Sequence, residues 1–130
     1  MLMPAAFFVI LMLGAITVDL SVVHLAQRNL LDVASGAAND AATAGLPPGS
    51  VRGGGPYRLD RQRTDDAARR SIARHRLPAG TTVAVRINAA RDEVTVELHR
   101  PVDYIFAKAI PGSRDGTTVE AVASATAIAR

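Results

Sequence analysis

The feature that most constrains this chain is an uncharged, strongly apolar run over residues 1–18. After Asp19 the apolar character resumes for about one turn. A helix over residues 2–23 would be about 33 Å long at 1.5 Å per residue, which matches a hydrocarbon core of about 30 Å. Pro4 falls in the first turn of such a helix, where its missing N–H costs least. The run therefore predicts a helix that spans a membrane.

Two other interpretations of the apolar run compete with a membrane anchor. A cleaved signal peptide has a basic segment before the run and a small-residue cleavage site after it, but the chain has no Lys or Arg before Arg28. A buried core helix is rarely apolar on every face. The anchor is favoured, while the charges that flank the run, Arg28 against Asp19, Asp32 and Asp40, leave the orientation open.

The composition excludes several classes of function for a chain of 130 residues, which has room for one domain. There are no cysteines, so disulfides and thiolate metal sites are excluded. A net charge of +3 is too small to argue for a nucleic-acid partner. Three histidines fall on different predicted elements, and the chain carries no phosphate-binding or nucleophile motif. We predict no catalytic residues, no metal, no cofactor, no small-molecule substrate and no enzymatic activity.

A heptad-like stripe extends the predicted helix beyond the membrane to Ala44, where Gly45 and the following prolines end it. The stripe narrows from large to small side chains, and its last five positions are Leu30, Ala34, Ala37, Ala41 and Ala44. Small residues allow helices to approach closely. We interpret these positions as a helix-assembly face for neighbouring subunits, and the alternative is that they pack on the protein's own sheet.

The rest of the chain divides by composition and by hydrophobic period. Residues 1–44 form the transmembrane and extended helix, 45–60 a Gly- and Pro-rich linker, and 61–130 a small α+β domain outside the cytoplasm. Thr64 is the expected N-cap of a short helix that ends near residue 76. Period-two patterns at 83–87 and 94–98, a helical turn at 103–110 and a last segment at 117–128 rich in Val, Ala, Ser and Thr predict a three-stranded, mainly antiparallel sheet. The predicted fold is α+β, a long helix followed by an αββαβ module.

Two sets of charged residues are further candidate sites. Asp19, at the end of the membrane run, is interpreted as an interfacial anchor or as a pairing group for a neighbouring subunit. A group of arginines forms either a solvated helix face or a patch for an anionic partner such as a lipid headgroup or a cell-wall polymer. Its members are Arg61, Arg63, Arg69, Arg70, Arg74 and Arg76.

The N-terminal segment resembles that of TadE/TadG-like proteins of the tight-adherence (Flp, type IVb) pilus system. The similarity lies in Val-Asp-Leu-Ser at 18–21, Leu-Ala-Gln-Arg-Asn-Leu-Leu at 25–31 and Ala-Ala-Asn-Asp-Ala-Ala at 37–42. The C-terminal half is also similar, with a strand that ends in Arg100-Pro101, a short aromatic helix and a final strand rich in Val, Ala, Ser and Thr. The resemblance covers most of the chain.

The resemblance implies a minor pilin or pseudopilin, a structural component of a pilus or a related secretion assembly. It implies a single-pass protein of the cytoplasmic membrane whose C-terminal domain lies outside, at the cell surface or in a pilus. The implied partners are the lipid bilayer and other pilin-like or assembly proteins, which the N-terminal helix would contact. The alternative function is an envelope-tethered binding domain that uses the arginine patch on an anionic polymer or lipid.

Overall fold

The predicted α+β class is confirmed by the structure, a computed structural model that describes residues 3–49, 53 and 58–127. The described elements are α1 (Met3–Ala44), α3 (Arg61–Arg74), β1 (Thr82–Asn88), β2 (Glu93–Asp103), the 3-10 helix η1 (Ala107–Ala109) and β3 (Gly116–Thr126). The three strands form one antiparallel sheet in the order β1-β2-β3. This is the long helix followed by an αββαβ module that the hydrophobic periods predict.

Helix α1 is continuous over 42 residues, roughly 63 Å at 1.5 Å per residue. It ends at Ala44, as predicted, and the Gly45 N–H closes its last turn on the Ala41 carbonyl at 2.9 Å. A Cβ at Gly45 would collide with the Thr64 hydroxyl and the Leu59 side chain, so glycine is needed for close packing here. Part of the predicted linker therefore belongs to the packed domain, while residues 50–52 and 54–57 lie outside the described residues.

Helix α3 begins three residues before the expected N-cap, Thr64. Its N-cap is Asp60, whose carboxylate accepts hydrogen bonds from the N–H groups of Gln62 and Arg63 at 3.0 and 3.2 Å. Asp is as good an N-cap as Thr, and its position lets Thr64 turn inward. The buried Thr64 hydroxyl donates to the Asp60 carbonyl at 2.7 Å.

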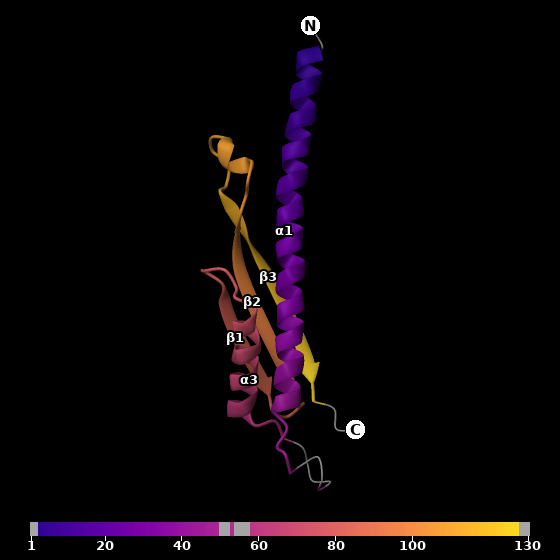
Figure 1. Cartoon of the computed structure of the whole chain (residues 1–130), viewed down its shortest axis with the longest axis vertical. Coiled ribbons are helices and arrows are strands. Elements are labelled where there is room, and N and C mark those ends of the chain that lie inside the picture. Colours follow the sequence, from indigo (N-terminus) through magenta and orange to yellow (C-terminus); the bar gives the residue numbers. More distant parts are fainter. Residues whose placement is uncertain (1–2, 50–52, 54–57, 128–130) are drawn as a thin grey trace.

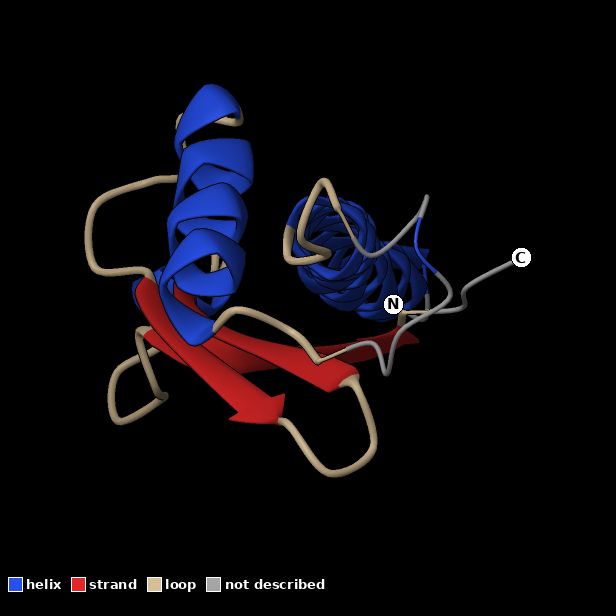
Figure 2. Ribbon diagram, turned by 90° about the horizontal axis from the view of Figure 1, so that it is seen from below, coloured by secondary structure: helices blue, strands red, loops and turns tan. Residues whose placement is uncertain are grey.

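Within the described residues, helices cover one face of the sheet, as seen along α1 in Figure 2. The covered face consists of the alternate positions Val94, Val96 and Leu98 of β2, with Val119 and Ala121 of β3. Strand β2 continues past the predicted end at Arg100-Pro101, because pairing with β3 extends to Asp103 opposite Gly116. The longer β2–β3 ribbon therefore reaches beyond β1.

The C-terminal half of α1 is part of the domain core. Its buried apolar residues are Ala26, Leu30, Val33, Ala34, Ala37, Ala38, Ala41 and Ala42. They form one cluster with the sheet face, Leu59 and the inner side of α3. The buried side chain Ser71 also donates to Asp40 at 2.7 Å and so joins α3 to α1. The module at 61–130 thus takes much of its core from α1.

The N-terminal part of α1 projects beyond the sheet (Figure 1). We call residues 3–18, which are all exposed except the half-buried Ala15, the projecting part of α1. At that end the β2–β3 ribbon carries residues 104–113 of its connecting segment, which we call the η1 loop, toward the projecting part of α1. The fold therefore places a loop from late in the chain beside the apolar N-terminal helix.

Candidate functional site

The projecting part of α1 presents apolar side chains to the outside on all sides. Phe8, Ile10 and Met12 are 66%, 67% and 60% exposed, although none of them carries a polar group. A helix apolar all round is stable only where something apolar covers it. Within the part of the chain that the structure describes, α1 is the helix long and apolar enough to cross a membrane, and it lies near the N-terminus. This segment is the first component of the candidate site.

Asp19 is the second component, because it joins the projecting helix to the η1 loop. Its Oδ1 accepts hydrogen bonds from the N–H groups of Ile105 and Phe106 at 2.7 and 3.1 Å, and its Oδ2 accepts one from Ala107 at 3.0 Å. Only 8% of the residue is exposed. The carboxylate thus caps the η1 turn and satisfies three backbone donors that would otherwise be costly beside apolar surface.

The structure therefore gives Asp19 partners within its own chain. The sequence-based interpretations placed it at the lipid headgroups or against a neighbouring subunit. Sequence reasoning missed residues 105–107 as functional partners, because they lie 86 to 88 positions away from Asp19. The partners are backbone N–H groups, so no side-chain pattern marks them.

Replacing Asp19 by Ala is expected to release the η1 loop from α1 while leaving the domain folded. The three N–H groups at 105–107 lose their acceptor, so hydrogen exchange there should rise toward the rate of an unstructured loop. Hydrogen–deuterium exchange of the full chain in detergent micelles measures this. Asp32→Ala is the matched control, since Asp32 is an exposed acid on the same helix. Unchanged exchange at 105–107 would contradict the cap.

The predicted helix-assembly face lies mostly inside the protein. Leu30, Ala34, Ala37 and Ala41 are fully buried in the chain's own core, and Ala44 is exposed. These residues therefore pack within the protein itself, which is the alternative interpretation of the stripe given by the sequence. Alanines occur here because α1 approaches both the sheet and α3 closely. The four buried side chains are covered, so a neighbouring subunit could not contact them without opening the domain.

The arginines of the candidate anionic-partner patch are exposed along and just after α3. Several have acidic partners on the same chain: Arg63 with Asp60 at 3.8 Å, Arg69 with Asp65 at 2.7 Å and Arg74 with Asp40 at 3.9 Å. The hydrogen bond to Asp65 raises the pKa of Arg69 above its ordinary value. Arg70 Nε donates to the Asp66 carbonyl at 3.2 Å. Exposed pairs of this kind contribute little to stability, and they are typical of a solvated helix face.

Arg61 and Arg76, the remaining members of that patch, are exposed at the two ends of this surface. Arg76 follows the C-cap residue His75 and has a positive φ of 45°, which turns the chain away from the helix. The six arginines thus extend over the whole length of α3 and are not gathered around one cleft.

A cluster of Glu97, His99 and Glu120 lies on the uncovered face of the sheet, a juxtaposition that sequence spacing did not reveal. Their ligand atoms lie within 4.8 Å of one another, because His99 and Glu120 are opposite each other in the β2–β3 register. Glu97 is already paired, with Arg86 at 3.1 Å and with His99 at 3.0 Å. Glu97 thus already has two partners, a cross-strand ion pair with Arg86 and a contact with His99 on its own strand.

The candidate functional site is therefore the end of the molecule where the projecting part of α1, Asp19 and the η1 loop meet. Strand β2, extended by its pairing with β3, positions the loop, and Asp19 fixes it to the helix. Comparison of the chain with protein-family models, curated proteins and solved structures gave no match.

Proposed function

We propose that this protein is a membrane-anchored structural component of a bacterial tight-adherence-type pilus or a related secretion assembly. It would cross the cytoplasmic membrane once and carry its domain outside. The observation that carries the proposal is the continuity of α1 from the exposed apolar segment into the domain core. Because one helix serves both, the domain cannot swivel independently of the span, and this rigidity suits a subunit that holds a fixed orientation in an assembly.

The resemblance of segments 18–21, 25–31 and 37–42 to TadE/TadG-like proteins supports the same function. The contact surface for other subunits, however, is assigned to the projecting segment, because the alanine stripe is occupied within the chain. Thr17 is exposed, and its hydroxyl donates back to the Leu13 carbonyl at 2.8 Å. A small residue whose hydroxyl is satisfied within its own helix allows close helix contact in lipid.

Photo-crosslinking in intact membranes of the source bacterium tests the assembly role. A photoreactive amino acid at Leu13, which is exposed, is expected to crosslink to other membrane proteins of a pilus or secretion assembly, identified by mass spectrometry. The same amino acid at Ala90, in the loop between β1 and β2, is the control on the far part of the domain. Adducts with lipid alone at position 13 would count against an assembly function.

The orientation in the membrane is tested with a cysteine at Ala90, since the chain has no native cysteine. This cysteine should react with a membrane-impermeant maleimide in intact cells whose outer layers admit the reagent. Labelling only after lysis would place the domain in the cytoplasm and would exclude the proposed role.

A further inference from the structure

The η1 loop exposes a group of large apolar side chains at the end of the domain nearest the apolar helix. Ile105, Phe106 and Ile110 are 56%, 46% and 52% exposed. Single exposed apolar residues are common on protein surfaces, but a group of three on a short loop indicates a contact with something apolar.

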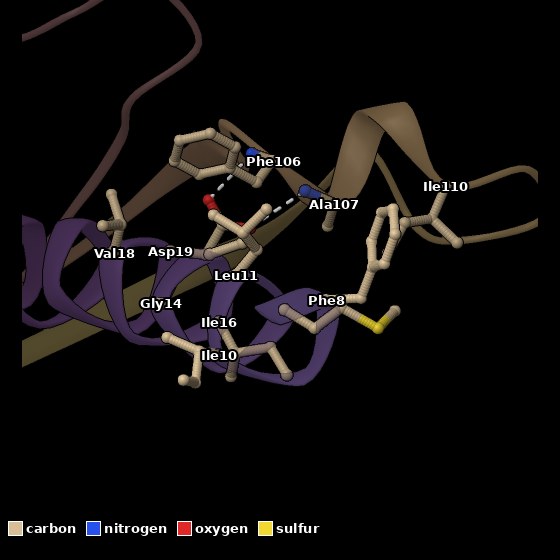
Figure 3. Close-up of a pocket in the computed structure, with 12 residues that line it drawn as sticks. Phe8, Ile10, Leu11, Gly14, Ile16, Val18, Asp19, Phe106, Ala107 and Ile110 are labelled. Atoms are coloured by element: carbon tan, nitrogen blue, oxygen red, sulfur yellow. Dashed lines mark hydrogen bonds between the residues drawn. The ribbon is translucent and has the colours of Figure 1, made fainter. Parts of the chain in front are cut away.

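An open apolar groove of about 720 Å³ lies between this loop and the projecting part of α1. Helix residues from Phe8 to Asp19 line one wall, and Phe106, Ala107 and Ile110 line the other (Figure 3). The loop therefore stands at the level of helix residues that carry no charge and that must lie in hydrocarbon if α1 crosses a membrane. Any bilayer that covers Phe8 and Ile16 reaches the loop as well.

The backbone of the η1 loop is suited to an environment without water. Asp19 accepts from the N–H groups of residues 105–107. The N–H groups of Tyr104, Ala109 and Ile110 donate to the carbonyls of Asp115, Phe106 and Ala107, each at 3.0 Å. In a bilayer, irregular backbone is tolerated only where its polar groups are satisfied within the protein. The loop meets this condition for these six donors.

We infer that the η1 loop is a second membrane-embedded element, which enters the outer leaflet beside α1 and is covered by phospholipid acyl chains. The inference rests on the membrane span proposed above, and it goes beyond it by making the membrane contact a helix plus a loop. The helix and the loop would then contact the bilayer at two separate places, and a second contact away from the helix axis resists tilting of α1. The loop would therefore set the angle between the domain and the membrane.

Acyl chains are favoured over a docked helix because the apolar surface continues outside the groove. Ile105 is exposed but does not line the groove, so a helix lying in the groove would leave it uncovered, whereas lipid surrounds the loop. Lys108, the chain's only lysine, is compatible with this depth. Its ammonium pairs with the exposed Asp103 at 3.2 Å, and a long lysine stem lets the charge reach the headgroup layer.

Site-directed spin labelling tests this inference in the full chain. Single cysteines at Ile105, Ile110, Ile16 and Val122 are labelled with a nitroxide, and the protein is reconstituted in vesicles of phosphatidylethanolamine and phosphatidylglycerol. Power saturation then compares collisions with oxygen, which concentrates in lipid, and with a water-soluble nickel chelate. Val122 is the matched control, because it is 49% exposed and lies on the uncovered face of the sheet. Labels at 105 and 110 should lose nickel accessibility and gain oxygen accessibility, as Ile16 does.

Three other results would each contradict the inference, and each would point to a different environment for the loop. Nickel accessibility at 105 and 110 equal to that at 122, with Ile16 still in lipid, would place the loop in water and leave the membrane span intact. Protection of both loop positions from both reagents would show that protein, such as a second copy, covers the loop. Nickel accessibility at Ile16 would remove the span itself and with it the proposed function.

Discussion

A chain that begins at Val18 is expected to fold as a soluble domain, whereas a chain that begins at Leu46 is expected to be unfolded. The first retains Asp19 and all the core residues of α1, and loses only the apolar projection. The second loses Leu30, Val33 and the buried alanines. Burial of one Leu or Val side chain contributes about 1.5–3 kcal/mol, while a whole domain is stable by only about 5–15 kcal/mol. Losing the helix also exposes the sheet face that it covers.

Circular dichroism and thermal unfolding of the two truncated chains measure this difference. The chain 18–130 should unfold cooperatively, and 46–130 should give no unfolding transition. If the change of composition at residue 45 marked a true domain boundary, the chain 46–130 would instead fold as an independent domain. A cooperative transition in 46–130 would mean that α1 merely lies against the module and does not complete its core.

The double variant Ala37→Leu/Ala41→Leu is expected to destabilise the domain strongly. Both alanines have no exposed surface, so each added isopropyl group must displace the sheet or α3. Overpacking costs typically about 1–3 kcal/mol per site. For a domain of this size each kcal/mol lowers the melting temperature by about 4–8 °C. The measurement is thermal unfolding of the variant in the 18–130 background.

Ala44→Leu is the matched control, because Ala44 continues the same stripe but is exposed. Its melting temperature should stay within a few degrees of the parent chain, since surface substitutions usually change stability by less than about 0.5 kcal/mol. If the stripe instead joined subunits, the double variant would unfold at the parent temperature and lose only its association with assembly partners. That result would reverse the assignment of these alanines to the chain's own core.

The features that the sequence predicted well are those that repeat or that end an element locally. The uncharged run at 1–18 and the stripe that follows it define α1, and Gly45 ends it. The alternation around 83–87 and 94–98 identifies β1 and β2 as strands. Such features depend on residues that are only a few positions apart, so the hydrophobic period of the sequence is enough to predict them. Local signals were less reliable at boundaries, where Asp60 replaced Thr64 as N-cap and pairing with β3 lengthened β2.

The sequence by itself determined that an apolar helix, a short helix and a three-stranded sheet exist. Only the tertiary structure decided which surfaces these elements pack against. The alanine stripe fits a neighbouring helix or the protein's own sheet equally well as a pattern, and the choice depends on where α3 and β3 pack. Asp19 has no local partner, because its three donors lie in a loop that only the extended β2–β3 ribbon carries to the helix. Contacts between distant segments leave no period in the sequence, and the candidate site is made of such contacts.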